Sequence, residues 1–98
     1  KSISMIVYNL GYLPGGDKTI TTTLDSTKKS LEAAFDLIKP GGVISVTCYP
    51  GHEAGKLEHE SVIQLASTLP VEKWSCCLHQ WINRNQAPSL VLIQRNLS

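Results

Sequence analysis

The chain has 98 residues and a formal net charge of +1; 42% of its residues are hydrophobic and 17% are charged. That length allows one small domain with a single core, and the composition is typical of a globular protein. The near-neutral charge argues neither for nor against a basic patch that binds nucleic acid. Every apolar run is shorter than a membrane span, and the N-terminus lacks the pattern of a secretory signal peptide.

The cysteines indicate the redox compartment. Cys48, Cys76 and Cys77 are an odd number, and two of them are adjacent, which does not suit a disulfide framework. We therefore expect a reducing compartment, cytoplasmic or organellar, and no secretion. The chain enters an apolar run almost at once and without an initiator Met, so we expect it to begin partway through a larger protein.

The first half of the chain predicts a strand, a helix and a second strand. Residues 3–8 form an apolar run that is typical of a short buried strand. Thr22 and Asp25 suit a helix start, because the hydroxyl caps a backbone N–H and the carboxylate favours the positive helix end. Residues 40–42, Pro-Gly-Gly, should end the helix, and residues 43–48 should form a strand covered on both faces. The expected apolar helix face comprises Thr27, Leu31, Ala34, Phe35 and Ile38, with Lys28, Lys29, Glu32 and Asp36 largely opposite.

The second half predicts a helix and a closing hairpin. The helix should run from about Glu53 to Thr68 and end at Pro70. Residues 74–82 should form a strand, and residues 90–94 a last strand after a short turn, which requires antiparallel pairing. The order β-α-β-α-β-β predicts an α/β layered domain with a terminal antiparallel hairpin. The helix should bury Val62, Ile63, Ala66 and Leu69, and the strand should carry Trp74, Cys76, Leu78 and Ile82 on one face.

Two loops that contain glycine and proline each follow a strand and precede a helix: residues 9–18 and residues 49–55. Open α/β sheets bind ligands at the carboxyl ends of their strands, so we expect both loops to lie together at one sheet edge. Glycine allows close approach of the backbone to a ligand, while proline stiffens the loop. Ordinary turn chemistry is the alternative interpretation of both loops.

A nucleotide-binding motif and a zinc-protease motif are each excluded by a single residue. Gly11-x-x-x-x-Gly16-Asp17-Lys18 departs from a P-loop, because Asp17 displaces the lysine and puts a carboxylate where phosphates would lie. His52-Glu53 does not begin a zinc-protease helix, because position 56 is lysine rather than histidine.

Cys76-Cys77-x-His79 is a third motif with metal-binding residue types. It lies on the predicted strand of residues 74–82, where neighbouring side chains point to opposite faces. Buried free cysteines are therefore favoured over a zinc site.

Several segments together resemble a known enzyme family. Leu37-Ile-Lys-Pro-Gly-Gly-Val-Ile44 resembles the turn before the fifth strand of class I S-adenosylmethionine-dependent methyltransferases. More specific are Asn9-Leu-Gly-Tyr-Leu-Pro-Gly-Gly-Asp-Lys18 and Tyr49-Pro-Gly-His-x-x-Gly55, which resemble the rRNA methylase family. The bacterial members of that family include a tRNA 5-aminomethyl-2-thiouridine methyltransferase.

The resemblance covers nearly the whole chain but only the C-terminal half of the family fold. It implies that residues 1–98 form a single partial domain with a Rossmann-like class I methyltransferase architecture. The half with the glycine-rich cofactor loop and the acidic ribose-binding residue is not in this sequence. In the family fold the last strand inserts antiparallel between its two predecessors. We therefore expect the order Ile3–Asn9, Val43–Cys48, Leu90–Gln94, Trp74–Ile82, with right-handed parallel crossovers.

The resemblance also implies roles for individual residues. Asn9 matches a position where many amino-methyltransferases carry Asn or Asp, and its carbonyl oxygen or that of Leu10 would hold the substrate amine in line. His52 and Asp17 are the candidate general bases that would deprotonate an alkylammonium substrate. A turn-forming role for Asn9, and a substrate or phosphate contact for His52, are the alternatives.

Other loop residues are expected to contact the substrate or the cofactor. Tyr12 would stack on a base or pack within its own loop. Lys18, Lys56 and Arg84 would contact tRNA phosphates or remain solvated surface charges. The substrate-binding candidates are Leu10, Tyr12, Asp17, Lys18 and Tyr49, the cofactor-binding candidates are Asn9 and Gly11, and the catalytic candidates are Asn9 and His52.

The implied function is RNA methylation with S-adenosyl-L-methionine, at the aminomethyl group of a modified tRNA wobble uridine. This chain would be the substrate-side half, inactive and weak in cofactor binding on its own. The alternative is a non-catalytic α/β module that self-associates, and a G-x-G-x-G-like loop upstream would favour the enzyme. A homodimer is expected because the missing strands and helices leave a sheet edge and an apolar face uncovered.

Overall fold

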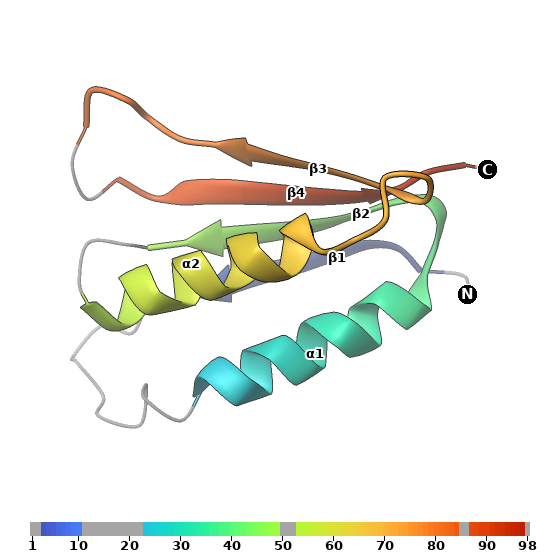
Figure 1. Ribbon diagram of the computed structural model, residues 1–98, viewed down its shortest axis with the longest axis horizontal. Helices are drawn as coiled ribbons and strands as arrows, with labels where there is room; N and C mark the ends of the chain where they lie inside the picture. Colours follow the sequence, from blue (N-terminus) through green and yellow to red (C-terminus); the bar gives the residue numbers. More distant parts are fainter. Residues whose placement is uncertain (1–2, 11–22, 50–52, 85–86, 98) are drawn as a thin grey trace.

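The computed structural model describes residues 3–10, 23–49, 53–84 and 87–97 (Figure 1). Within them, strands and helices follow the predicted β-α-β-α-β-β order. None of the helices in these ranges is long and apolar enough to cross a membrane. The elements are β1 (Ile3–Leu10), α1 (Thr23–Leu37), β2 (Ile38–Cys48), α2 (Glu53–Ser67), β3 (Trp74–His79) and β4 (Ser89–Arg95).

The four described strands form one mixed sheet in the order β1-β2-β4-β3. β1 pairs with β2 in parallel, and β4 runs antiparallel to both β2 and β3. This order and these directions confirm the arrangement expected from the family resemblance, including the insertion of the last strand between its predecessors. The hand of the crossovers stays a prediction.

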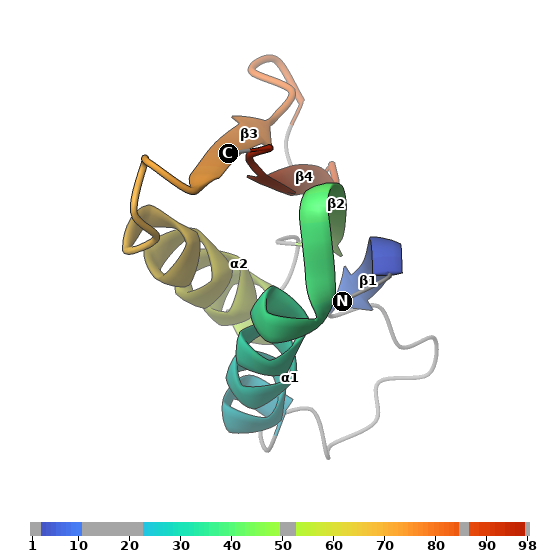
Figure 2. The ribbon, with the colours of Figure 1, turned by 90° about the vertical axis from the view of Figure 1, so that its right-hand side faces the viewer.

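Both helices pack on the same face of the sheet, which leaves the other face without a helix in the described part of the chain (Figure 2). Alternate residues of β2 face the helices and are completely buried, whereas Val43, Ser45 and Thr47 point to the helix-free face and are half-buried. The core beneath the helices comprises Leu31, Ala34, Ile38, Ile44, Val46, Cys48, Val62, Ala66, Trp74, Val91 and Ile93.

The junction between α1 and β2 differs from the prediction. The helix ends at Leu37, and Ile38 is already paired with Ile3 of β1, so residues 38–42 belong to the strand. Gly41 has a φ of 86°, a left-handed value that bends the chain, which a side chain would strain. A Cβ at Gly42 would lie 2.7 Å from Cγ1 of Ile38, so only glycine leaves room for this buried side chain. The Pro-Gly-Gly segment therefore shapes the strand rather than capping the helix.

β3 is shorter than predicted. It ends at His79, and Ile82, expected on the same strand face as Trp74, lies beyond it and is fully exposed. The three cysteines are free, as expected, but only Cys48 is buried; Cys76 and Cys77 are exposed, so the prediction that they are buried is wrong. The reason is position, because β3 is at the edge of the described sheet and Trp74 alone of its residues is buried.

Candidate functional site

The carboxyl ends of β1 and β2 lie side by side. Asn9 is paired with Thr47, Leu10 is paired with Cys48, and Tyr49 follows directly. The first turn of α2 and the hairpin between β3 and β4 lie at the same edge, on the left of Figure 1. The sheet thus brings together the starting points of both predicted site loops, as expected for parallel strands.

Asn9 lies on the helix-free face, and the side chain before it explains why. The Tyr8 hydroxyl lies 2.8 Å from Oγ of Ser30 and 3.2 Å from the Ser30 carbonyl oxygen on α1, which fixes Tyr8 on the helix face. Because strand side chains alternate, Asn9 must point away from the helices. The Asn9 side chain is exposed and presents both a carbonyl acceptor and an amide donor to solvent.

The predicted site residues divide between described and undescribed parts of the chain. The structure describes Asn9, the backbone of Leu10, and Tyr49, which is half-buried at the end of β2. It brings these three to one edge of the sheet. The remaining candidates lie outside the described residues: Gly11, Tyr12, Asp17, Lys18 and His52.

A buried polar cluster lies beneath this edge, between the two helices and the sheet. Thr27 of α1 donates a hydrogen bond of 3.0 Å to Oε2 of Glu58 on α2, and Glu58 is only 3% exposed. Burial, together with the Glu58 carboxylate, raises the pKa of the Cys48 thiol to about 11. Cys48 therefore remains a protonated thiol at neutral pH and cannot serve as a nucleophile.

His59 is a second buried titratable residue on α2, and it is 7% exposed. Burial lowers the pKa of His59, although the nearby Glu60 carboxylate acts in the opposite direction. Its Nε2, like Oγ of Ser89, is buried without a hydrogen-bond partner among the described residues. Sequence interpretation missed this buried imidazole, which lies on the helix-covered side of the sheet and therefore on the side opposite to Asn9.

The signal that points to Glu58 and His59 is helical spacing. They precede Val62 and Ile63 by four residues, so they share the apolar helix face that packs on the sheet. Polar residues at such positions are buried, and a buried polar residue has a structural or chemical role.

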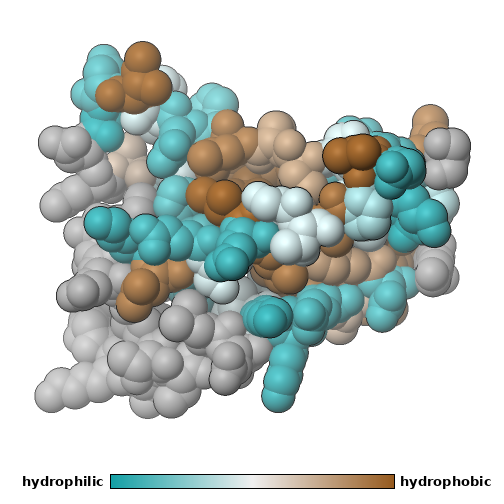
Figure 3. Space-filling view, in the orientation of Figure 1, coloured by the Kyte–Doolittle hydropathy of each residue, from teal (hydrophilic) through white to brown (hydrophobic). Residues whose placement is uncertain are grey.

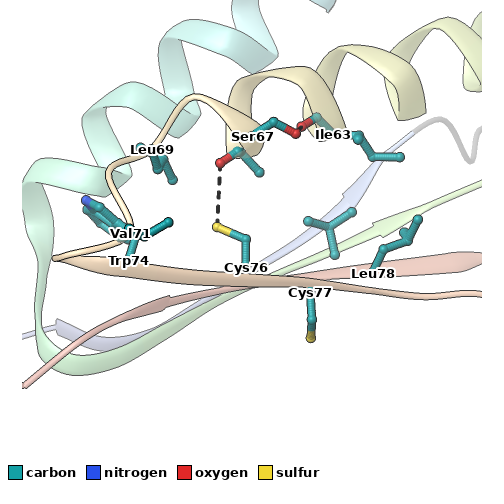
Figure 4. Close-up of a pocket in the computed structure, with 10 residues that line it drawn as sticks. Ile63, Ser67, Leu69, Val71, Trp74, Cys76, Cys77 and Leu78 are labelled. Carbon is teal, nitrogen blue, oxygen red and sulfur yellow. Dashed lines mark hydrogen bonds between the residues drawn. The ribbon is translucent and has the colours of Figure 1, made fainter.

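An apolar cavity of about 260 Å³ lies between α2 and β3, away from Asn9 (Figure 4). Cys76 points into it and its thiol donates to the Ala66 carbonyl oxygen at 3.7 Å, whereas Cys77 points to the opposite face of the strand. Because β3 separates the two thiols, the Cys76-Cys77-x-His79 motif does not converge on one point. The cavity is lined by Ile63, Ala66, Ser67, Leu69, Val71, Trp74, Cys76, Cys77, Leu78 and Val91.

Comparison with known proteins identifies the family. The family model described as "Putative rRNA methylase" matches residues 1–95. The chain belongs to this family. The expectation drawn from the two loop segments is thereby confirmed.

Among curated relatives in this family, a chloroplastic protein of Arabidopsis thaliana named tRNA (mnm(5)s(2)U34)-methyltransferase is 48% identical over 91 residues. The match covers 93% of this chain but 33% of the relative, so the chain spans about a third of that protein's length.

Solved structures in the family agree with the fold. A "putative rRNA-methylase" from Clostridium thermocellum has a TM-score of 0.85 and 34% identity, over 95% of this chain and 50% of that one. A "putative methyltransferase" from Streptococcus mutans, solved in complex with SAH, has a TM-score of 0.70 and 29% identity, over 95% of this chain and 51% of that one. Both matches cover about half of the solved chains, in agreement with a partial Rossmann-like fold.

Proposed function

We propose that this chain is the substrate-side, C-terminal half of an S-adenosyl-L-methionine-dependent RNA methyltransferase. Its substrate would be the aminomethyl nitrogen of a modified wobble uridine in tRNA. Family membership and the tRNA-modifying name of the Arabidopsis relative support the reaction class and the RNA. The observation that carries the proposal for this chain is the pairing of Asn9 with Thr47, which puts an exposed carboxamide at the shared end of two parallel strands.

The described residues fit one end of the proposed cofactor. S-adenosyl-L-methionine supplies an electrophilic methyl group, and the Streptococcus mutans relative was solved with SAH. At the sheet edge, Asn9 offers polar atoms to the methionine end or to the substrate. Glu58, the buried carboxylate near this edge, is engaged by Thr27 and is therefore a poor partner for ribose hydroxyls. We expect these residues alone to bind the cofactor weakly in a calorimetric titration.

Asn9 would position the reacting amine. A neutral amine attacks with its lone pair, and an amide oxygen that accepts one of its N–H groups fixes the direction of that lone pair. Oδ1 of Asn9 and the Leu10 carbonyl oxygen are the acceptors that we propose at the end of β1. Tyr49, at the end of the neighbouring strand, would contribute an aromatic contact to the substrate.

The amine must lose a proton before it attacks, and His52 and Asp17 of the loops are the candidates to accept it. His59 is a poor candidate, because it is 7% exposed on α2, which packs on the sheet face opposite to that of Asn9. A reducing compartment, cytoplasmic or organellar, agrees with the three free cysteines and with the chloroplastic name of the Arabidopsis relative.

The test is methylation of tRNA by the complete enzyme that contains this chain, with Asn9→Ala as the variant. Loss of the positioning oxygen should lower turnover on the order of 10²-fold with little change in folding stability. Val7→Ala is the matched control, because Val7 is exposed on the same strand and face. If Asn9→Ala turns over at the wild-type rate, Asn9 only forms the turn and does not position the amine. A complete enzyme that methylates no tRNA would refute the proposed function.

Self-association is a second candidate property of this chain. Met5 and Val7 are 61% and 59% exposed on β1, the edge strand of the described sheet. An exposed apolar edge strand pairs readily with another chain. A homodimer formed across this edge is the proposed assembly of the 98-residue chain on its own; in the complete enzyme, strands of the other half would cover this edge.

A further inference from the structure

The hairpin between β3 and β4 carries an exposed aromatic and basic cluster. The indole of Trp81 is flanked by the guanidinium of Arg84, 5.5 Å from the ring centroid. The His79 ring packs against it edge-on, with centroids 5.7 Å apart and an interplanar angle of 79°. The hairpin projects from the sheet at the upper left of Figure 1, and the same region of Figure 3 shows hydrophobic and hydrophilic side chains together.

A second tryptophan shows that this exposure is specific to the hairpin. Trp74 also has an arginine over its ring, with Arg95 at 5.1 Å, and it packs on Phe35 at 5.2 Å. Trp74 is 8% exposed and belongs to the core, whereas Trp81 is 53% exposed. The Trp81 ring therefore contributes little to the core and keeps a face open to solvent.

The acidic residues of the chain all lie outside this hairpin. Residues 73–98 contain no Asp or Glu, and all eight acidic residues of the chain precede them. Of the three Lys and Arg residues in this segment, Arg84 lies beside Trp81, whereas Arg95 pairs with Trp74 at the other end of β3. An exposed aromatic ring with an adjacent arginine, in a segment without acidic residues, suits a polyanion that carries flat groups.

The sheet register connects this cluster to the proposed site. Asn9 pairs with Thr47, Thr47 pairs with Leu90, and Leu90 pairs with His79, so all four lie in one row across the sheet. Paired residues point to the same face, so His79 lies on the helix-free face with Asn9. Three strand spacings separate Asn9 from His79 by about 14 Å. A few nucleotides of an unpaired strand span that distance.

We infer that Trp81 is a stacking platform for an unpaired base of the RNA substrate, with Arg84 contacting a neighbouring phosphate. This inference rests on the proposed function, because it takes the substrate to be RNA. An aromatic ring stacks on any base, and an arginine held beside it adds a charge for the backbone. The cluster would hold a loop nucleotide a few positions away from the one that reaches Asn9, so it selects unpaired over paired RNA.

The test measures binding of the 98-residue chain to a labelled hairpin RNA with an unpaired loop, and to a blunt duplex of equal length. Trp81→Ala should weaken binding to the loop about 5- to 150-fold and leave duplex binding unchanged. Trp81→Phe should restore most of the affinity. For the loop RNA, Arg84→Ala should reduce the slope of the logarithm of the binding constant against the logarithm of salt concentration by about one. Ile82→Ala is the matched control, because Ile82 is fully exposed on the same hairpin.

Equal loop binding by Trp81→Ala and the wild type would overturn the inference. So would a sedimentation coefficient that falls in Trp81→Ala without RNA, since the hairpin would then be a contact between copies of the chain. Failure of the proposed function gives a different result. The complete enzyme would then methylate no tRNA, while this chain would still bind the loop RNA through Trp81, and the stacking site would be supported without the function. Loss of methylation in Asn9→Ala but not in Trp81→Ala would leave the function standing and remove the stacking role.

Discussion

The Thr27 hydroxyl donates a hydrogen bond of 3.0 Å to Oε2 of Glu58 and joins α1 to α2 beneath the candidate site. Thr27 lies on the apolar face of α1, and Glu58 is 3% exposed on α2. A buried carboxylate is costly unless hydrogen bonds compensate its lost hydration. The hydrogen bond therefore joins the two helices, because α2 supplies the buried Glu58 carboxylate and α1 supplies a donor to it.

Thr27→Val should lower the free energy of unfolding by about 1–3 kcal/mol, because the variant keeps the shape but removes the donor to a buried carboxylate. Urea denaturation measures this change. Thr27→Ser retains the hydroxyl and should remain close to the wild type. If the valine and serine variants unfold at the same urea concentration, the hydrogen bond contributes nothing to stability.

The stability of the protein should fall in mild acid because of His59. Burial lowers its folded-state pKa below the ordinary value of 6.5, so the unfolded chain binds more protons in the interval between the two values. The stabilisation is complete above pH 6.5 and is lost as the pH falls toward the folded-state pKa. Urea midpoints measured on both sides of pH 6.5 should show this decline.

His59→Gln should flatten that pH dependence, since glutamine is polar but does not titrate. His79→Gln is the control, because it makes the same replacement at an exposed position on β3. An unchanged slope in His59→Gln would assign the acid sensitivity to another group.

Much of the fold follows from the sequence because its hydrophobic runs are unambiguous. Residues 43–48 alternate between full and partial burial as a central strand, and the predicted helix of residues 53–68 ends within one residue of the observed Ser67. The start of β2 was predicted wrongly, because Ile38 fits the helical period of α1 but pairs with Ile3 in the sheet. The end of β3 was predicted wrongly for the converse reason, because the alternating pattern continues to Ile82 although pairing with β4 ends at His79.

The candidate site was less accessible to sequence interpretation. Asn9 was singled out because it matches a position where many amino-methyltransferases carry Asn or Asp, and its role stays a prediction. Glu58 and His59 were missed because a helix of mixed composition does not show which polar residue turns inward. The role proposed for Trp81 depends on register, which places His79 in the row of Asn9 although 70 positions separate them in the chain.

Thiol alkylation should proceed in a fixed order. Cys77 is exposed and points away from the cavity, Cys76 contacts the Ala66 carbonyl and burial raises its pKa, and Cys48 is 0% exposed with a pKa of about 11. Since the thiolate is the reactive form, iodoacetamide should label Cys77 first, Cys76 more slowly and Cys48 only on unfolding.

Cys76→Ser and Cys77→Ser are the matched pair of variants. Mass spectrometry of each labelled variant assigns the labelling rate to one of the two adjacent cysteines. Labelling of Cys48 in the native protein at the rate of Cys77 would mean that the core opens much faster than its burial implies.

The edge strand β1 gives the last prediction, self-association of the 98-residue chain. Met5 and Val7 are more than half exposed on the helix-free face, and the outer edge of β1 has no strand partner within the described sheet. Burying this strand across a two-fold axis would satisfy its backbone groups and cover its apolar side chains at once. A charge on the strand opposes such pairing, because the ammonium group would lose its hydration at the interface.

The wild-type chain should therefore sediment as a dimer at micromolar concentration, and Val7→Lys should shift it to a monomer. Val71→Lys is the control, because Val71 is 80% exposed in the turn between α2 and β3 and lies off this strand. A wild-type monomer would contradict the prediction, and so would equal effects of the two lysine substitutions, because general charge repulsion would then explain the change. Dimer loss confined to Val7→Lys would place the interface on β1.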